Sequence, residues 1–252
     1  MTGESRIPCA SVAQPWQASG VAGLPDGAPE APSTHSVAQA GPAQSRDQQG
    51  KGGDGAGTQQ LHDSAAAQDA KAAKAALRKA LKAGRAALDD ADKAAHDARI
   101  GAQVLAWWRR TRPPLLAVYW PLSGEPDLME AYRALAAEGA ALALPVVVER
   151  HAPLAFAEWL PGEAMALDPL GVTVPAQLRL VARPPALLVP CLGYNEHGYR
   201  LGYGGGFYDR TLAGGVRPAT LGVAYACQLA AFDADVHDVP LDLIVTEDSA
   251  LE

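Results

Sequence analysis

The feature that most constrains the fold is the alternation of short apolar runs with helical segments over the second half of the chain. Apolar runs of strand length cover residues 115–119, 142–148, 154–159, 187–189, 221–226 and 241–246. A helix is expected over 127–138, with Gly139 ending it. Apolar strands separated by helices predict an α/β fold with a mostly parallel sheet flanked by helices. In such sheets, ligands bind beyond the carboxyl ends of the strands.

Two further helices are predicted before the first of these strands. The alanine-rich segment that starts near Ser64 favours a helix. Its basic residues recur at spacings of three and four and share one face: Lys71, Lys74, Arg78, Lys82 and Arg85. Asp89 has the character of an N-cap for a second helix, which ends before Pro113.

Residues 1–64 differ in composition from the remainder of the chain. They are rich in Gly, Ala, Pro, Ser and Gln and hold almost no large apolar residues. Such a segment buries too little apolar surface to offset the entropy of ordering it. We therefore predict a disordered low-complexity extension over 1–64 and one domain over 65–252.

Charge is spread unevenly along the chain, whose net charge is −7. Residues 71–112 carry 11 basic and 4 acidic side chains, whereas residues 113–252 carry 7 basic and 17 acidic ones. A basic segment on an acidic body indicates an anion bound locally and argues against a nucleic-acid partner. Lys93 is the last lysine of the chain, so a lysine that binds phosphate must come from the N-terminal part.

The three cysteines, Cys9, Cys191 and Cys227, have neither disulfide-framework nor metal-finger spacing, which favours a reducing compartment. No apolar stretch is long enough to span a bilayer, and no secretory signal pattern is found at the N-terminus. We therefore expect a cytoplasmic protein with no membrane partner.

The most informative stretch is the glycine-rich segment over residues 198–210. Glycines at 202, 204, 205 and 206 let the backbone adopt positive φ and approach a ligand closely. A helix start expected near Gly206 and the arginines at 200 and 210 favour an anion. No lysine follows the glycines, so this is not a Walker A loop. From physical reasoning alone, a tight structural turn and a phosphate-binding loop both remain open.

Residues 200–210, Arg-Leu-Gly-Tyr-Gly-Gly-Gly-Phe-Tyr-Asp-Arg, resemble the signature of the 5-formyltetrahydrofolate cyclo-ligase (methenyltetrahydrofolate synthetase) family. The similarity runs from about Lys74 to Glu247 and includes residues 74–78, 119–125 and 237–242. The resemblance implies a fold like that of the sugar-phosphate isomerase and CoA-transferase group. It also implies an ATP- and Mg²⁺-dependent ligase that converts 5-formyltetrahydrofolate to 5,10-methenyltetrahydrofolate, releasing ADP and phosphate through a phosphorylated formyl (imidate) intermediate.

The resemblance also implies roles for individual residues. ATP-binding positions are Lys74, Arg78, Arg200, Leu201, Gly202, Tyr203, Gly204, Gly205, Gly206, Phe207 and Tyr208. Folate-binding positions are Trp120, Glu125, Gly204, Gly205, Gly206, Phe207 and Tyr208. Arg200 and Tyr208 are the implied catalytic residues, and Asp209 and Asp238 the implied Mg²⁺ ligands.

Each of these roles has a structural alternative. Lys74 and Arg78 can belong to a solvated basic face, Asp209 can be a helix-start acid, and Asp238 a turn residue. The alternative function is a folate- or nucleotide-binding, or RNA-associated, relative of the same fold without turnover. The expected partner is the small-molecule substrate 5-formyltetrahydrofolate; the oligomeric state is not fixed by the sequence, and a monomer is favoured.

Overall fold

A computed structural model of the protein describes residues 55–122 and 124–248, with the side chains of the first helix described from residue 68 onward. The predicted disorder of the N-terminal extension lies outside the described residues as far as residue 54. The helices are α1 (Gly55–Ala86), α2 (Asp90–Thr111), α3 (Met129–Ala137), α4 (Phe207–Ala213) and the 3₁₀ helix η1 (Ala226–Gln228). The strands are β1 (Leu116–Ala117), β2 (Leu142–Val146), β3 (Ala155–Trp159), β4 (Met165–Leu167), β5 (Thr173–Pro175), β6 (Leu180–Val181), β7 (Ala186–Pro190), β8 (Gly193–Tyr194), β9 (Arg200–Leu201), β10 (Ala219–Val223) and β11 (Leu243–Val245).

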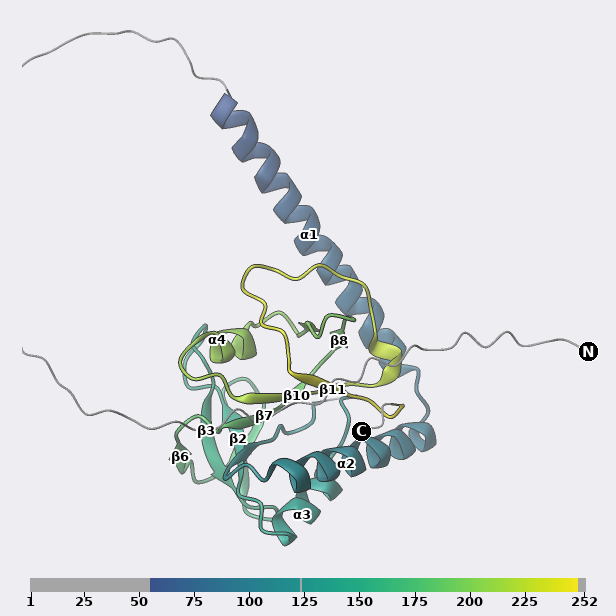
Figure 1. Ribbon diagram of the computed structural model, residues 1–252. Helices are drawn as coiled ribbons and strands as arrows, with labels where there is room; N and C mark the ends of the chain where they lie inside the picture. Colours follow the sequence, from purple (N-terminus) through teal and green to yellow (C-terminus); the bar gives the residue numbers. More distant parts are fainter. Residues whose placement is uncertain (1–54, 123, 249–252) are drawn as a thin grey trace, which may run out of the picture. The chain divides into compact units, whose positions relative to one another are not determined.

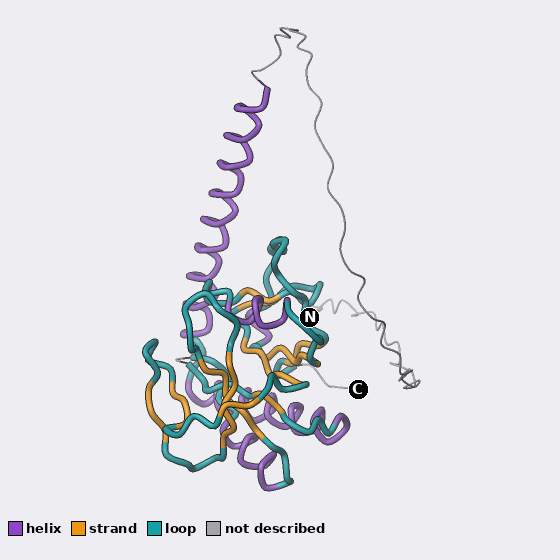
Figure 2. The backbone as a smooth tube through the Cα atoms, turned by 90° about the vertical axis from the view of Figure 1, so that its left-hand side faces the viewer, coloured by secondary structure: helices purple, strands orange, loops and turns teal. Residues whose placement is uncertain are grey.

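The central sheet has seven strands in the order β11-β10-β7-β1-β2-β3-β6. The five strands from β11 to β2 run parallel, and β3 and β6 continue the sheet in antiparallel fashion. Two small antiparallel pairs, β4 with β5 and β8 with β9, lie outside it. Long loops connect the short strands and are drawn in teal in Figure 2. The prediction of a mostly parallel sheet flanked by helices is therefore confirmed.

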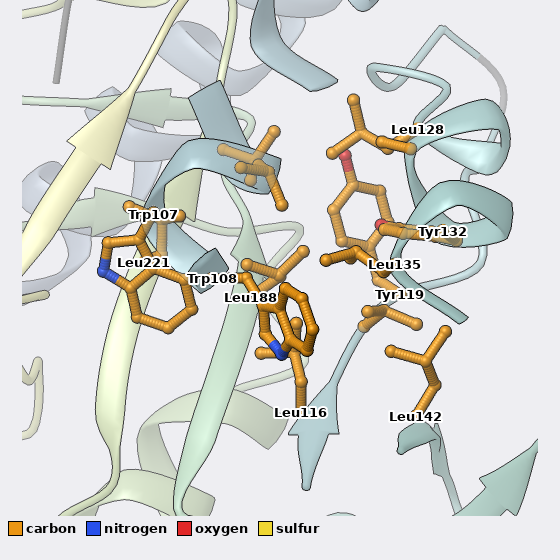
Figure 3. Packing of buried hydrophobic residues seen from close by; sticks show 14 of the residues in the cluster. Trp107, Trp108, Leu116, Tyr119, Leu128, Tyr132, Leu135, Leu142, Leu188 and Leu221 are labelled. Atoms are coloured by element: carbon orange, nitrogen blue, oxygen red, sulfur yellow. The ribbon is translucent and has the colours of Figure 1, made fainter. Parts of the chain in front are cut away.

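Side chains of the sheet alternate between its two faces and contribute to a large apolar core on each, beside a small third cluster of Val146, Ala157 and Val174. In β7, Leu188 joins the core under α2 and α3, whereas Leu187 and Val189 join the core on the other face, with Leu212 of α4. Figure 1 shows α2 and α3 together on one side of the sheet and α4 on the other. Figure 3 shows the larger core, where side chains of α2, such as Trp108, meet those of α3 and the central strands.

Helix α2 begins as the sequence predicted. The Asp89 carboxylate accepts hydrogen bonds from the backbone N–H groups of Ala91 and Asp92, both at 2.9 Å, which is N-cap geometry. Helix α1, in contrast, begins at Gly55, nine residues before the predicted start at Ser64. Residues 56–64 contain no proline that would stop the helix from continuing toward the N-terminus.

None of the helices in residues 55–122 and 124–248 combines the length and the apolar character needed to cross a membrane.

A close helix contact makes one stability prediction possible. Gly101 of α2 faces α3, and a Cβ atom at this position would lie 3.1 Å from the Cβ of Ala131. We expect Gly101→Val to lower the free energy of unfolding by about 1–3 kcal/mol, because the added methyl groups force the helices apart. Urea unfolding measures this. The matched control is Gly84→Ala in α1, where nothing lies within 4 Å and alanine should stabilise the helix. Equal effects at the two sites would contradict the packing explanation.

Candidate active site

A large cleft opens at the carboxyl ends of the parallel strands. Its volume is about 1490 Å³, and its floor includes Tyr119 and Trp120 after β1, Val147 after β2, and Pro190 at the end of β7. This is the edge at which parallel sheets bind ligands. The cleft is lined by every predicted site residue: Lys74, Arg78, Trp120, Glu125, Arg200, Leu201, Gly202, Tyr203, Gly204, Gly205, Gly206, Phe207, Tyr208, Asp209 and Asp238. Residues far apart in sequence thus meet in one place.

The basic face of α1 forms one wall of the cleft. Arg78 donates a hydrogen bond from Nε to the carbonyl oxygen of Gly202 at 2.8 Å, which fixes the start of the glycine-rich loop. One helical turn earlier, the Lys74 ammonium group forms an ion pair with Asp238 at 3.2 Å. Asp238 belongs to the loop between η1 and β11, which lies beside α1 in Figure 1. The alternative of a purely solvated basic face does not describe these two side chains, since both are partly buried.

The glycine-rich loop takes a backbone shape that requires glycine at particular positions. Gly204 has φ +96° and Gly206 has φ +65°, both in the region that side chains disfavour. A Cβ atom at Gly206 would lie 2.7 Å from an Nη1 atom of Arg210. Arg210 itself donates a hydrogen bond to the carbonyl oxygen of Gly205 at 2.7 Å. The arginine at the end of the loop therefore holds the loop in shape.

Arg200 is the buried cation of the cleft. Its side chain is 5% exposed and forms an ion pair with Asp209 at 2.8 Å. Its guanidinium carbon lies 5.2 Å from the ring centroid of Tyr208, within cation–π range. Among the described residues, its buried Nε atom has no hydrogen-bond partner. A guanidinium that is paired with one carboxylate and still has an unused N–H donor is suited to bind a second anion.

Burial keeps the tyrosines of the cleft protonated. Burial is the largest cause that raises the pKa of Tyr208, followed by the nearby negative charge of Glu125, while Arg200 acts in the opposite direction. The pKa of Tyr203 is raised for the same two leading reasons. Both hydroxyl groups are therefore neutral hydrogen-bonding groups at ordinary pH and do not act as bases.

Glu125 is a buried carboxylate with one oxygen in use. Its residue is 3% exposed, and its Oε2 accepts a hydrogen bond from the backbone N–H of Leu122 at 2.8 Å. Its buried Oε1 finds no hydrogen-bond partner within the part of the chain that the structure describes. Buried carboxylate oxygens are normally satisfied, so this oxygen is an acceptor available to a ligand. Trp120 lines the cleft and packs edge-on against Trp159, with ring centroids 6.1 Å apart.

Two carboxylates are available for a metal ion. Asp209 and Asp238 both line the cleft, and each is 22% exposed and paired with one cation, Arg200 or Lys74. Within residues 55–122 and 124–248, no three His, Cys, Asp or Glu side chains group closely enough to hold a metal on their own. Mg²⁺ in nucleotide sites takes one or two carboxylates together with phosphate oxygens and water. The donor set fits that kind of ion and not a protein-only metal site.

One buried residue near the cleft was not singled out from the sequence. Arg85 lies in the last turn of α1, is 6% exposed, and donates a hydrogen bond to the Tyr203 hydroxyl at 2.9 Å. Its spacing from Lys74 and Arg78 placed it on the basic face, but spacing does not tell which members of such a face are buried. Two other aromatic residues pack in the interior, Trp159 in the core under α2 and α3 and Phe156 in the core on the opposite face of the sheet.

The chain resembles known proteins over most of its length. Residues 70–247 match the profile of the 5-formyltetrahydrofolate cyclo-ligase family. The chain is 32% identical over 155 residues to the 5-formyltetrahydrofolate cyclo-ligase of Escherichia coli K12, covering 56% of this chain and 85% of that protein. It is 28% identical over 176 residues to the enzyme of the same name from Mycoplasma genitalium, covering 68% of this chain and 96% of that protein.

Solved structures give the same answer. The 5,10-methenyltetrahydrofolate synthetase of Mycoplasma pneumoniae superposes with a TM-score of 0.59 at 27% identity, covering 69% of this chain and 99% of that one. The corresponding protein of Aquifex aeolicus gives a TM-score of 0.58 at 27% identity, covering 70% and 90%. The profile match spans most of the chain and includes every predicted site residue. The chain therefore belongs to the 5-formyltetrahydrofolate cyclo-ligase family, a family of ligases.

Proposed function

We propose that this protein catalyses the ATP-dependent cyclisation of 5-formyltetrahydrofolate to 5,10-methenyltetrahydrofolate, with release of ADP and phosphate. The observation that carries the proposal is the meeting, in one cleft, of a cationic wall and a buried carboxylate acceptor. The cleft volume of about 1490 Å³ exceeds the roughly 300–1,000 Å³ of ordinary small-molecule pockets. A cleft of this size has room for a nucleotide and a folate side by side.

In the proposed reaction, the formyl oxygen on N5 attacks the γ-phosphorus of ATP, and the bond from that phosphorus to the β–γ bridging oxygen breaks. N10 then attacks the activated formyl carbon, the carbon–oxygen bond breaks, and phosphate leaves with the formyl oxygen. The proton of N10 is lost as the ring closes. No protein nucleophile takes part, so catalysis depends on positioning and on stabilising the developing charge.

The arginine and tyrosine of the loop supply that stabilisation. We propose that Arg200 binds the phosphoryl group during its transfer, since a buried guanidinium is a permanent cation with fixed donors. Its charge acts in a partly dry cleft and is therefore more effective than in water. Tyr208 stays protonated and orients the bound groups as a hydrogen-bond donor. Lys74 and Arg78 hold the triphosphate from the α1 side.

The folate side is assigned to Glu125 and Trp120. The unpartnered oxygen of Glu125 suits the amino and ring N–H groups of a pterin, which donate hydrogen bonds. The ring of Trp120 offers an apolar surface for the flat pterin. Glycines 204–206, together with Phe207 and Tyr208, would lie between the two ligands, since their loop lines the same cleft.

We propose that Asp209 and Asp238 hold Mg²⁺ together with phosphate oxygens of the nucleotide. When bound, the ion supplies positive charge that neutralises the phosphate oxygens.

The free thiols of Cys191 and Cys227 are consistent with work in a reducing compartment such as the cytoplasm.

The function is tested by the absorbance of the methenyl product after the purified protein is mixed with 5-formyltetrahydrofolate, Mg²⁺ and ATP. We expect the product band only when ATP is present. Folded protein that binds ATP and 5-formyltetrahydrofolate but forms no band would make this chain a binding relative without turnover, and the proposed reaction would be wrong.

A substitution on α1 tests the nucleotide side. We expect Lys74→Met to raise the KM for ATP about tenfold, with the KM for 5-formyltetrahydrofolate unchanged, because a charge-assisted phosphate contact is lost. Steady-state kinetics with each substrate varied in turn measure this. Lys79→Met is the matched control, since Lys79 is exposed on the same helix and does not line the cleft among the described residues. A change of the folate KM alone would contradict the assignment.

A further inference from the structure

Arg85 connects three segments that carry the proposed binding residues. It lies at the end of α1, seven residues after Arg78 and therefore on the same helical face. Its side chain extends to Tyr203 in the glycine-rich loop, where Nη2 donates to the hydroxyl at 2.9 Å and the guanidinium carbon lies 5.8 Å from the ring centroid. The described residues that line the cleft do not include Arg85, so the residue reaches a ligand only through its neighbours.

The second contact of Arg85 is with the turn that precedes Glu125. Gly124 in this turn has φ +78°, and a Cβ atom there would lie 3.1 Å from Nε of Arg85. The turn closes with a hydrogen bond from the Glu125 N–H to the Leu122 carbonyl oxygen at 2.9 Å. The guanidinium thus lies against the backbone of the segment that aims Glu125 into the cleft.

The two residues that Arg85 connects, Tyr203 and Glu125, are also related to each other. Tyr203 and Glu125 line the same cleft, and next to burial the charge of Glu125 is the largest cause that raises the pKa of Tyr203. Arg78 fixes the adjacent residue of the loop through the Gly202 carbonyl oxygen. The helix therefore contacts the loop at two consecutive residues, and the Arg85 side chain also contacts the Glu125 turn.

We infer that Arg85 is a positioning residue that fixes Tyr203 and Glu125 relative to each other, and so couples the nucleotide side of the cleft to the folate side. This inference rests on the proposed function. Arg85 touches neither substrate; it sets the distance between the loop assigned to ATP and the carboxylate assigned to folate. Its planar fork and its position against Gly124, which has no side chain, suit this task, and a lysine ammonium group cannot reproduce both contacts.

The test is a double-mutant cycle of Arg85→Met and Tyr203→Phe, read as KM for 5-formyltetrahydrofolate, KM for ATP, and kcat. We expect Arg85→Met to raise both KM values about tenfold, the size of one lost hydrogen bond to a charged group. Tyr203→Phe should act in the same direction, and the double variant should resemble Arg85→Met alone. Arg85→Lys should rescue little, because charge without the fork does not hold the turn.

The matched control is Lys82→Met. Lys82 lies on the same helix, with its ammonium nitrogen 5.1 Å from the Tyr203 ring centroid, but its side chain is exposed, whereas Arg85 is buried. Both KM values should stay within about twofold of wild type, since exposed charges contribute little. A purely structural role for Arg85 would lower the fraction of folded enzyme and hence the apparent kcat, with both KM values unchanged.

Each result then decides a separate point. Unchanged KM values in folded Arg85→Met, or effects of the two substitutions that multiply, would overturn the inference while leaving the reaction intact. If Arg85→Met does not fold, Tyr203→Phe decides, since it removes one hydroxyl group: unchanged KM values overturn the inference. A wild-type protein that forms no methenyl product would overturn the proposed function itself, and this inference with it.

Discussion

Replacing Arg200 by alanine is expected to lower kcat/KM for cyclisation about a thousandfold. The side chain is 5% exposed and forms an ion pair with Asp209 beside the glycine-rich loop. Removing one preorganised donor to a developing anion costs enzymes about 10²–10³ in rate, and arginines at phosphoryl groups lie at or above that range. Single-turnover rates of methenyl formation measure the effect on the chemical step.

Two comparisons separate chemistry from folding in this experiment. Arg200→Ala leaves Asp209 without its ion-pair partner, so circular dichroism and thermal unfolding must show that the variant is folded. Arg110→Ala, an exposed arginine of α2, is the control and should keep wild-type rates. A folded Arg200→Ala protein with a rate within tenfold of wild type would remove Arg200 from the catalytic assignment.

Replacing Glu125 by glutamine is expected to weaken binding of 5-formyltetrahydrofolate about a hundredfold and to leave ATP binding unchanged. The amide keeps the size of the side chain and can still accept from the Leu122 N–H. It loses the charge that strengthens hydrogen bonds from the pterin, each of which contributes about 1.5–3 kcal/mol. Equilibrium binding of the folate without ATP measures this directly.

The control for the glutamate is Glu130→Gln. Glu130 is exposed on α3 and should have no effect on either ligand. Should Glu125→Gln weaken ATP binding as much as folate binding, the carboxylate would be acting through the shape of the cleft, and its assignment to the pterin would be wrong.

The sequence predicted the elements whose patterns are local. The cap at Asp89 and the apolar strands at 187–189 and 142–148 were found because an N-cap and an apolar run need no knowledge of distant residues. The short strands β4, β5 and β6 were not predicted, because two or three residues are too few to show alternation. Their pairing depends on partners elsewhere in the chain.

Pro145 shows how tertiary pairing resolves a local conflict. A proline within a strand removes a hydrogen-bond donor, so an interruption or a strand end is the usual expectation at such a position. In the structure Pro145 stays within β2, but β1 pairs with this strand only at Leu142 and Ala143. The proline thus lies beyond the end of the shorter neighbour, where β1 requires no hydrogen bond from it.

The residues of the cleft were predicted as one set from the family resemblance, because their spacing in the sequence alone does not indicate that they lie together. Nothing in the sequence separation of Glu125 from Tyr203 indicates that they line one cleft, since that depends on how β1 of the central sheet and the separate β8–β9 pair are placed in the fold. The burial of Arg85 could likewise not be predicted, because the sequence does not distinguish which of five basic residues on one helical face is buried. Which of them faces the protein is decided by the glycine-rich loop and the loop that carries Asp238, both of which contact α1.

The pairing of Arg200 with Asp209 has an entropic consequence for ligand capture. A free arginine side chain loses rotamer freedom equivalent to about 1.5–2 kcal/mol when a ligand immobilises it. Here the ion pair and the ring of Tyr208 already hold the guanidinium, so this loss occurs when the chain folds and not when a phosphate arrives. An incoming anion then meets a receptor of fixed shape, and more of the contact energy remains as affinity.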